Sequence, residues 1–304
     1  MSATQPKEPE RRPVTTTALR AMKDARQPIV MITAYDTPTA RLVDEAGVDV
    51  ILVGDSVGMV VLGLDSTLPV TMDDMLRHVS AVVRGTKRAL VVADMPFLSF
   101  QITAEDALRN AGRFLAEAGA SAVKVEGGRR VAPVVQRIVE AGIPVMGHVG
   151  LTPQSVHQFG GYKVQAKETP AALELLEDAR ALQDAGAFAV VLECIPAELA
   201  SIVSEEIEIP TIGIGAGLGC DGQVQVLHDV LGLGDFTPKH AKRYADVGAA
   251  IRDGVQAYAR DVRGGDFPAE EHGTRMEPDA AAEVEKLRSR GLRAVAGGVQ
   301  DEEA

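Results

Sequence analysis

The chain contains few of the residues that build disulfide scaffolds, cysteine metal sites or aromatic cores. Its 304 residues include two cysteines, Cys194 and Cys220, no tryptophan and only 4% aromatic residues. Two distant cysteines without CxxC or Cys/His spacing argue against a disulfide framework and a zinc site, and favour a reducing compartment. Hydrophobic residues still make up 46% of the chain. A core is therefore expected, and it must be built mainly from aliphatic side chains.

Positive charge is also scarce. The chain has 31 Lys and Arg against 43 Asp and Glu, a net charge of −12, and its pI is about 5.0. This balance argues against nucleic acid or an anionic membrane as a partner. No uncharged apolar stretch approaches the ~20 residues of a membrane span, and the opening MSATQPKEPERRP lacks the apolar segment of a secretory signal. We therefore expect a soluble, cytoplasmic protein.

The most informative feature of the sequence is a series of short apolar runs, each of which ends near an acid, a lysine or a histidine. Such runs, without polar alternation, are typical of strands buried on both faces in a parallel sheet covered by helices. A charged group at a strand end costs folding energy unless it has a partner or a function. Their recurrence predicts a ring of functional groups around one opening. The runs are Val50–Ser56, Leu90–Asp94, Ala122–Glu126, Pro144–His148 and Ala189–Glu193.

Amphipathic segments alternate with the apolar runs and commonly stop at a glycine, as helices do. Alternating strands and helices form either an open doubly wound sheet or a closed barrel. Near-eightfold repetition over roughly 230 residues favours a (β/α)8 TIM barrel, whose sites lie at the carboxyl ends of the strands. We expect strands at Ile29–Thr33, Val48–Val53, Ala89–Ala93, Ala122–Val125, Pro144–Gly147, Phe188–Leu192 and Thr211–Ile214, a weak eighth at Gly232–Phe236, and a helix at Gln223–Leu231.

The two ends of the chain differ from this pattern. Residues 1–14 are polar and are expected to form a disordered tail, followed by a short helix at Thr15–Arg26. The barrel is expected to span residues 15–263. Residues 264–304 are expected to form a C-terminal extension that is partly helical, near Asp279–Leu292, or disordered.

Three carboxylates, Asp55, Asp94 and Glu126, end successive predicted strands. They would converge at one side of the barrel mouth, and three anions cannot lie together without a cation. Oxygen ligands from one or two carboxylates, completed by waters and substrate oxygens, predict a Mg²⁺ site. Lys124 can add a second positive charge if its side chain enters the mouth. Alternatively, each acid merely caps the helix that follows it.

His148 and Glu193 end two further strands. A single histidine at such a place is more often a hydrogen-bonding residue than a metal ligand, so His148 is expected only to line the site. Glu193, flanked by Leu192 and Cys194, suits proton transfer. A structural salt bridge for Glu193 explains its position equally well.

Two glycine-rich segments are weaker signals. Gly213–Gly219 resembles a dinucleotide loop, but it follows the seventh strand instead of the first, so NAD binding is poorly supported. A compact loop that lets the backbone approach a ligand is favoured. Gly160–Lys163 lies in a long insertion after the fifth strand, which is expected to be either a lid or a subunit contact.

The chain resembles the ketopantoate hydroxymethyltransferase family in several motifs that occur in family order between about Thr15 and Arg260. The motifs are Thr33–Asp36, Leu52–Met59, Asp65–Thr71, Ala93–Phe97, Val123–Gly128, Gly147–Ser155, Phe159–Gln165 and Leu192–Pro196.

The resemblance implies roles for the strand-end residues. Asp55 and Asp94 match direct Mg²⁺ ligands, through which they hold the substrate, and Glu126 matches a third carboxylate of the metal shell. Ser56 and Lys124 match the groups that hold the substrate carboxylate and keto oxygen, and Glu193 matches the proton acceptor.

The resemblance also implies a reaction and an assembly. Members of the family are TIM barrels that form homodecamers and act in pantothenate (coenzyme A) biosynthesis. They transfer a hydroxymethyl group from 5,10-methylenetetrahydrofolate to 3-methyl-2-oxobutanoate and give 2-dehydropantoate.

Two other functions compete with this interpretation. The first is another Mg²⁺-dependent enolate barrel, such as a carbon–carbon lyase or mutase of the phosphoenolpyruvate/pyruvate group. Those lyases usually use a gating loop with Cys or Asp, which His148–Gln165 does not resemble. The second is a non-enzymatic scaffold, which would not need all three strand-end carboxylates.

Overall fold

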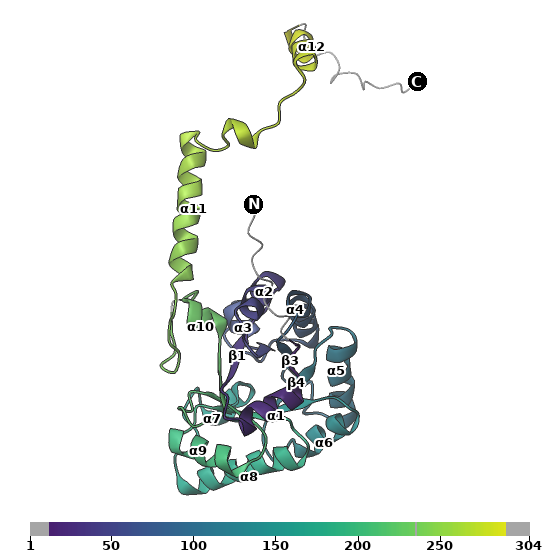
Figure 1. Ribbon diagram of the computed structural model, residues 1–304, viewed down its shortest axis with the longest axis vertical. Coiled ribbons are helices and arrows are strands. Elements are labelled where there is room, and N and C mark those ends of the chain that lie inside the picture. The colour runs from purple at the N-terminus through teal and green to yellow at the C-terminus, as the bar shows by residue number, and fades with distance from the viewer. Residues whose placement is uncertain (1–11, 235, 290–304) are drawn as a thin grey trace, which may run out of the picture. The chain divides into compact units, whose positions relative to one another are not determined.

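The computed structural model describes residues 12–234 and 236–289, and its central feature is a closed barrel of eight parallel strands (Figure 1). Each strand pairs with its neighbours in chain order, and β1 closes the ring against β8. The TIM barrel expected from the sequence is confirmed. The strands are β1 Ile29–Thr33, β2 Val50–Val53, β3 Leu90–Asp94, β4 Ala122–Glu126, β5 Val145–Gly150, β6 Ala189–Glu193, β7 Thr211–Ile214 and β8 Gly222–Gln225.

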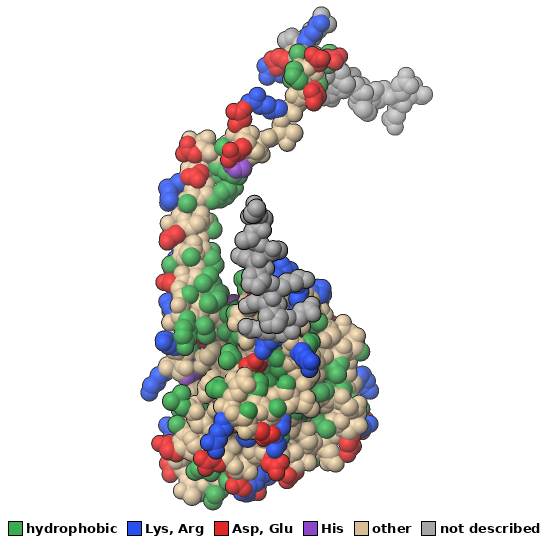
Figure 2. All heavy atoms as spheres, viewed as in Figure 1, with side chains coloured by type: hydrophobic (Ala, Val, Ile, Leu, Met, Phe, Trp, Pro, Cys, Tyr) green, Lys and Arg blue, Asp and Glu red, His purple; other side chains and the backbone are tan. Residues whose placement is uncertain are grey.

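Helices join the strands and cover the outside of the barrel, where α4, α5, α6, α8 and α9 follow one another (Figure 1). Lys and Arg are interspersed with Asp and Glu on the visible surface of the barrel (Figure 2). Local sequence sets the helix starts: α4 begins at a capping box between Thr71 and Asp74. The barrel helices are α1 Thr16–Asp24, α2 Thr37–Glu45, α3 Val57–Val60, α4 Met72–Gly85, α5 Ala104–Ala116, α6 Ala132–Glu140, η1 Pro153–Ser155, α7 Val156–Phe159, α8 Thr169–Asp184, α9 Ala197–Glu206 and α10 Leu227–Leu231.

Alternate residues of each strand fill the barrel interior. Leu90, Val92 and Met146 belong to one buried cluster inside the ring, whereas Val91 and Val123 belong to a second cluster beneath the helices. The division follows from strand geometry, because successive side chains point to opposite faces. The absence of polar alternation in the sequence therefore reflects two apolar environments, one on each side of the barrel wall.

Helix α1 closes the amino-terminal end of the barrel. Leu19 is fully buried and packs with the interior cluster. The Lys23 ammonium lies 2.9 Å from the Asp221 carboxylate and donates to the carbonyls of Ser204 and Ile209. The helix expected before the barrel is thus confirmed, and its apolar face fills the lower end of the ring.

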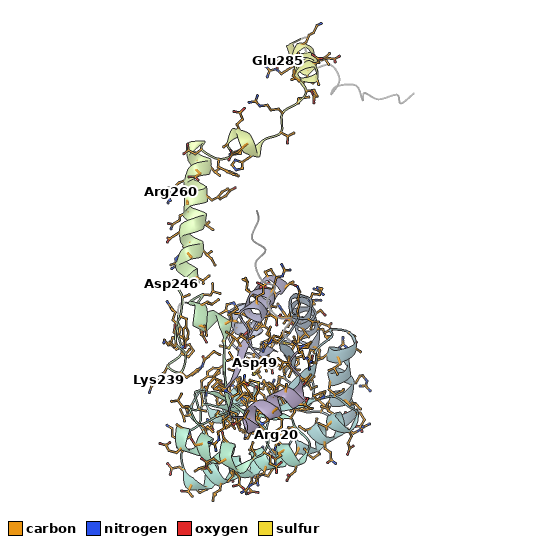
Figure 3. All side chains as sticks on the ribbon, viewed as in Figure 1. Arg20, Asp49, Lys239, Asp246, Arg260 and Glu285 are labelled. Carbon is orange, nitrogen blue, oxygen red and sulfur yellow. The ribbon has the colours of Figure 1, made fainter. Side chains whose placement is uncertain are left out.

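An ion pair joins two strand starts at the same end. The Arg88 guanidinium lies 2.9 Å from Asp49, which precedes β2 and is labelled within the barrel in Figure 3. Asp49 also accepts from the Val30 N–H at 3.0 Å. The charged residues at this end therefore have structural partners.

The eighth strand lies earlier in the chain than expected. β8 is Gly222–Gln225, so the strand expected at Gly232–Phe236 is wrong; of that expected strand, Asp235 lies outside the described residues. The helix expected at Gln223–Leu231 is confirmed only in its second half, as the short α10, because Gln223–Gln225 belong to β8. β8 offers little apolar periodicity because its only large apolar residue is Val224. Pairing with β1 and β7 defines it. Gly222 permits the pairing, since a Cβ there would lie 2.5 Å from the Ile29 carbonyl oxygen.

The chain divides into two compact units, and the boundary between them lies between Gly248 and Ala249. The boundary falls within α11, Val247–Gly264, which is followed by η2 Glu270–His272 and α12 Pro278–Ser289. In the second unit, the rings of Tyr258 and Phe267 meet edge to face with centroids 5.6 Å apart. Across residues 12–234 and 236–289, no helix combines the length and apolar character of a membrane span.

The expected end segments are only partly described. Residues 1–11 of the expected tail 1–14 lie outside the described residues, and the Val14 N–H donates to the Arg88 carbonyl at 2.8 Å. Of the helix expected at Asp279–Leu292, residues 290–292 lie outside the described part. The division into a barrel at 15–263 and an extension at 264–304 stays a prediction.

Candidate active site

The two-residue period of the strands places polar side chains inside the mouth of the barrel. Asp94 follows Leu90 and Val92 on the inward face of β3, and Lys124 and Glu126 follow Ala122 on β4. His148 follows the inward Met146 on β5, and Glu193 follows Ala189 and Val191 on β6. The lower layers of the barrel are thus aliphatic and the uppermost layer is charged. Lys124 is two residues after the inward-facing Ala122 on β4, so its side chain also points inward and enters the mouth.

Lys124 lies at the centre of this layer. Its ammonium is 2.9 Å from Asp94 Oδ1, with both side chains at most 5% exposed, and 4.0 Å from Glu126 Oε1. It also lies 3.1 Å from His148 Nδ1. Burial opposes the ammonium charge, but the carboxylates of Asp94, Glu126 and Asp55 outweigh it and raise the pKa of Lys124. Lys124 is therefore held as a cation.

His148 links the acids of β4 and β6. Its Nδ1 is 3.5 Å from Glu126 Oε1, and its Nε2 is 3.2 Å from Glu193 Oε2 without hydrogen-bond alignment. Burial and Lys124 lower its pKa, but Glu126 and Glu193 outweigh them, so the net pKa of His148 is raised. An ammonium can only donate, so in the neutral ring the contact with Lys124 makes Nδ1 an acceptor and leaves the proton on Nε2, beside Glu193.

The carboxylates carry more negative charge than the site balances. Burial, followed by repulsion from Asp94 and Glu126, raises the pKa of Asp55 well above its usual range. Burial also raises the pKa of Asp94, although Lys124 opposes the shift. Burial acts against ionisation of Glu126 too, but His148 and Lys124 lower its pKa. Protonation or an added cation would relieve this excess.

The donor set fits a hard divalent cation. Among the described residues, no three His, Cys, Asp or Glu side chains form a ready-made metal cage. Mg²⁺ does not require one, because it usually keeps several waters and takes one or two carboxylates together with substrate oxygens. Asp94 Oδ1 is buried and, within the described chain, has the ion pair with Lys124 but no hydrogen bond. This oxygen is the kind of donor that a cation would satisfy.

Gln154 is a residue of the site that no sequence pattern predicted. Its side-chain amide donates to Asp55 Oδ2 and to the Met95 carbonyl, each at 2.9 Å, while its backbone N–H donates to Glu126 Oε2 at 3.0 Å. Gln101 donates to its Oε1 at 2.9 Å. Gln154 thus orients two carboxylates from different strands. Its only sequence signal was its place in the segment Gly147–Ser155, because a glutamine after a strand predicts no particular contact.

Ser56 lies beside Asp55 at the start of α3, and its hydroxyl is 2.9 Å from that of Tyr35, a second missed residue. Burial raises the pKa of Tyr35, and the nearby Asp94 and Asp55 add to the rise. The Asp55 N–H donates to Asp94 Oδ2 at 3.1 Å. The structure therefore brings all the predicted site residues into one cluster: Asp55, Ser56, Asp94, Lys124, Glu126, His148 and Glu193.

The glycine loop Gly213–Gly219 has a packing role. A Cβ at Gly217 would lie 2.5 Å from the Ala197 Cβ, and a Cβ at Gly219 would lie 2.0 Å from the Ser201 Oγ. Close approach to α9 therefore accounts for these glycines without a ligand.

The insertion after β5 reaches the segment that follows β2. The Tyr162 hydroxyl donates to the Met59 sulfur at 3.7 Å. Burial raises the pKa of Tyr162, with added contributions from Asp55, Glu193 and Glu126, so the phenol lies within electrostatic reach of the acidic cluster. The position agrees with a lid over the mouth.

Comparison with known proteins points to one family. The sequence model described as ketopantoate hydroxymethyltransferase matches residues 13–270. A protein named 3-methyl-2-oxobutanoate hydroxymethyltransferase from Carboxydothermus hydrogenoformans is 60% identical over 267 residues, covering 88% of this chain and 97% of that protein. One of the same name from Gluconacetobacter diazotrophicus is 57% identical over 267 residues, covering 88% and 96%.

Solved structures share the barrel at much lower identity. A phosphonopyruvate hydrolase has a TM-score of 0.57 at 17% identity, covering 93% of this chain and 99% of that one. A 2,3-dimethylmalate lyase has a TM-score of 0.55 at 20% identity, covering 93% and 98%. These likenesses show the fold alone. The sequence matches, which span most of the chain, show that it belongs to the ketopantoate hydroxymethyltransferase family.

Proposed function

We propose that this protein transfers a hydroxymethyl group from 5,10-methylenetetrahydrofolate to 3-methyl-2-oxobutanoate and forms 2-dehydropantoate, in pantothenate biosynthesis. Two relatives of 57–60% identity bear the name of this activity. The observation that carries the proposal is the buried ring of acids around Lys124 at the barrel mouth. A cytoplasmic location, expected from the composition, is part of the same proposal.

The keto acid offers a carboxylate and an adjacent keto oxygen to the residues of β2 and β4. Lys124 is a buried cation, and the Ser56 hydroxyl is oriented by Tyr35. These two groups would hold the negative oxygens of the substrate by charge-assisted hydrogen bonds. Apolar residues of the barrel exclude water below them, which strengthens these interactions.

Asp55 and Asp94 would hold Mg²⁺, with Glu126 completing the acidic shell. A bound Mg²⁺ supplies Lewis-acid stabilisation of the charge that develops on the keto oxygen. Gln154 contributes by fixing one oxygen of Asp55 and one of Glu126, so that each carboxylate keeps a defined orientation. Such supporting hydrogen bonds commonly determine metal affinity.

Glu193 is assigned to proton transfer. Its side chain is 17% exposed, so it faces the open mouth and remains accessible to a substrate. It accepts the C3 proton, and the carbanion forms a bond to the methylene carbon. Both bonds between that carbon and the two folate nitrogens break, and water supplies the hydroxyl group of the product. The C3 proton and the remaining proton of the water end on the two nitrogens, which gives tetrahydrofolate. His148, with its Nε2 3.2 Å from Glu193 Oε2, lies against the acid and positions it.

The test is an assay with purified protein. Consumption of 3-methyl-2-oxobutanoate should require both 5,10-methylenetetrahydrofolate and Mg²⁺, with formation of 2-dehydropantoate followed by mass spectrometry. Turnover without folate, with cleavage of a carbon–carbon bond, would instead indicate a lyase of the same fold.

We also propose that the chain assembles as a homo-oligomer, and specifically as the decamer that the family resemblance implies. Helix α11 has no buried residue, and four large apolar side chains follow one face of it at helical spacing. Figure 2 shows hydrophobic side chains along this helix. The residues are Ile251, Val255, Tyr258 and Val262, which are 45–61% exposed. A second copy of the chain is the proposed partner for this face.

A further inference from the structure

A cavity of about 390 Å³ lies between the segment after β2 and the insertion after β5. Asp65 and Ser66 line it on one side, and Val156, His157 and Tyr162 line it on the other. Its volume is within the range of ~300–1,000 Å³ that small-molecule sites occupy. The roles assigned above to the acidic ring do not use these residues, so the cavity is available to a second ligand.

The cavity adjoins the acidic ring through Tyr162. This residue lines the cavity, donates to the Met59 sulfur on α3, and lies within electrostatic reach of Asp55, Glu193 and Glu126. Helix α3 begins directly after Ser56. The cavity is therefore on the same side of the barrel as the site that holds the keto acid, and Tyr162 and α3 connect the two.

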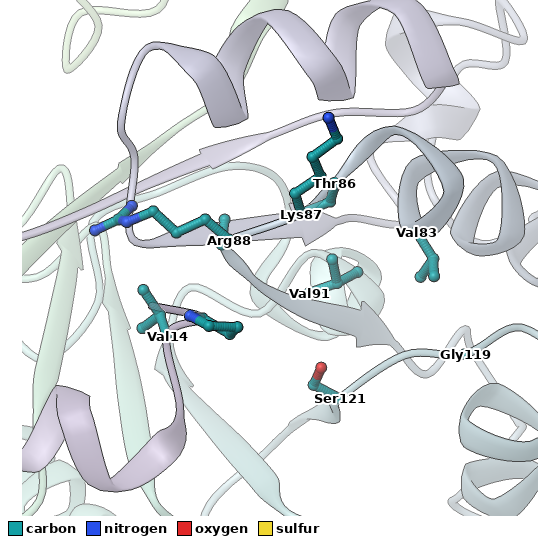
Figure 4. Close-up of a pocket in the computed structure, with 10 residues that line it drawn as sticks. Val14, Val83, Thr86, Lys87, Arg88, Val91, Gly119 and Ser121 are labelled. Atoms are coloured by element: carbon teal, nitrogen blue, oxygen red, sulfur yellow. The ribbon is translucent and has the colours of Figure 1, made fainter. Parts of the chain in front are cut away.

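A second cavity, of about 180 Å³, lies at the amino-terminal ends of the strands (Figure 4). A ligand there would be far from the keto acid. This second cavity is lined by Arg88 and Ala89, which precede β3, by Ser121, which precedes β4, and by Val14. The aliphatic layers of the barrel interior separate these residues from the mouth.

The carboxylate of Asp65, at one side of the larger cavity, favours a flat ligand with paired donors. Asp65 would repel the carboxylate of a keto acid. A pterin ring presents a ring N–H and an amino group side by side, which match the two oxygens of a carboxylate as a guanidinium does. Tyr162 offers an aromatic face against which such a ring can pack. The open space beside Gly161, where a Cβ would meet nothing within 4 Å, leaves room for it.

We propose that this cavity binds the pterin ring of the reduced folate, with Asp65 accepting from its amino-pyrimidinone edge and Tyr162 packing on its face. The proposal rests on the proposed use of 5,10-methylenetetrahydrofolate and adds the residues that recognise it. Lys163 lies at the rim, with its Nζ 3.4 Å from the Cβ position of Gly160. Its ammonium is placed to meet the glutamate carboxylates of the folate tail, which extends towards solvent.

The experiment compares Asp65→Asn, Tyr162→Ala and Tyr162→Phe with wild type in the full-length protein with Mg²⁺. Calorimetric titration with tetrahydrofolate reports binding, and steady-state kinetics reports the KM for 5,10-methylenetetrahydrofolate. Asp65→Asn should weaken binding by about tenfold or more, since it removes a charged hydrogen-bond acceptor. Tyr162→Ala should also weaken it, whereas Tyr162→Phe keeps the ring and should bind nearly as wild type. Asp184→Asn, an exposed acid at the end of α8, is the matched control.

Exchange of the C3 hydrogen of 3-methyl-2-oxobutanoate with D₂O, without folate, separates the two proposals. This partial reaction should persist in the Asp65 and Tyr162 variants while transfer falls, because it does not need the pterin. If Asp65→Asn and Tyr162→Ala bind tetrahydrofolate as well as wild type does, the cavity assignment is overturned and the proposed function stands. If the wild-type protein neither binds tetrahydrofolate nor catalyses exchange, the proposed function and this inference fall together.

Discussion

Asp94 and Glu193 both occupy the uppermost inward position of a strand, but their surroundings suit them to different tasks. Asp94 is buried 2.9 Å from Lys124, and its Oδ2 accepts from the Asp55 N–H. Glu193 is partly exposed and contacts His148. At the residue scale, these differences separate the role of holding a cation from the role of moving a proton.

Asp94→Asn should weaken Mg²⁺ binding and transfer together. The substitution keeps the shape of the side chain but removes one charge from the acidic ring and leaves the Lys124 cation less well compensated. Calorimetric titration with Mg²⁺ measures the affinity, and thermal unfolding checks that the variant remains folded. Asp184→Asn should bind Mg²⁺ as wild type does. Wild-type Mg²⁺ affinity in Asp94→Asn would refute the proposed metal site.

Glu193→Gln should instead retain binding and lose rate. If Glu193 is the general base, kcat should fall by roughly 10²–10⁴-fold while Mg²⁺ and substrate still bind. NMR of C3 exchange in D₂O with Mg²⁺ and no folate measures the step directly, and the variant should exchange far more slowly than wild type. Unchanged exchange would restrict Glu193 to the folate or hydrolysis step and make His148 the next candidate base.

At the scale of the elements, barrel closure depends on a strand with almost no apolar signal. β8 pairs with β1, with Gly222 opposite Ile29 at one end and Gln225 opposite Ile32 at the other. It pairs with β7 on its other side. The helix that follows it, α10, spans only Leu227–Leu231. Hydrogen bonds and close backbone approach therefore place this strand, with side-chain burial contributing less than in β2–β6.

Gly222→Ala should destabilise the protein by about 1–3 kcal/mol through overpacking. A Cβ at this position would lie 2.5 Å from the Ile29 carbonyl oxygen and 2.8 Å from Ile212 Cδ1. Gly112→Ala in α5 is the control, because its Cβ would meet nothing within 4 Å, and helix propensity predicts a gain of up to about 1 kcal/mol. Urea denaturation of both variants measures the difference. Equal stability would show that the β1–β8 contact can relax without cost.

At the scale of the whole molecule, the exposed apolar face of α11 predicts association. Ile251→Glu should dissociate the proposed homodecamer, because it places a charge among Val255, Tyr258 and Val262. Arg260→Glu, which also adds negative charge to this helix, should not, since it lies off the apolar face (Figure 3). Sedimentation velocity at micromolar protein measures both variants. A monomeric wild-type protein would refute the assembly without affecting the catalytic proposals.

Local sequence patterns were enough to indicate the fold class and the set of acids at the mouth. Aliphatic runs such as Leu90–Asp94 identify strands because burial on both faces requires continuous apolar character, whatever the neighbours are. The last polar residue of each run identifies the mouth, because parallel strands in a barrel all end at the same face. These features are local, so they can be read without knowing which segments meet.

Contacts between distant segments were needed to identify β8, the role of Gln154 and the cavity lined by Asp65 and Tyr162. Gly222–Gln225 is a strand only because β1 and β7 supply its hydrogen-bond partners. Gln154 acquires a role only because Asp55, 99 residues away, lies 2.9 Å from its amide. Asp65 and Tyr162 line one cavity because barrel closure brings the segments after β2 and β5 together. Each of these depends on contacts between residues distant in the chain, for which a local sequence pattern carries no signal.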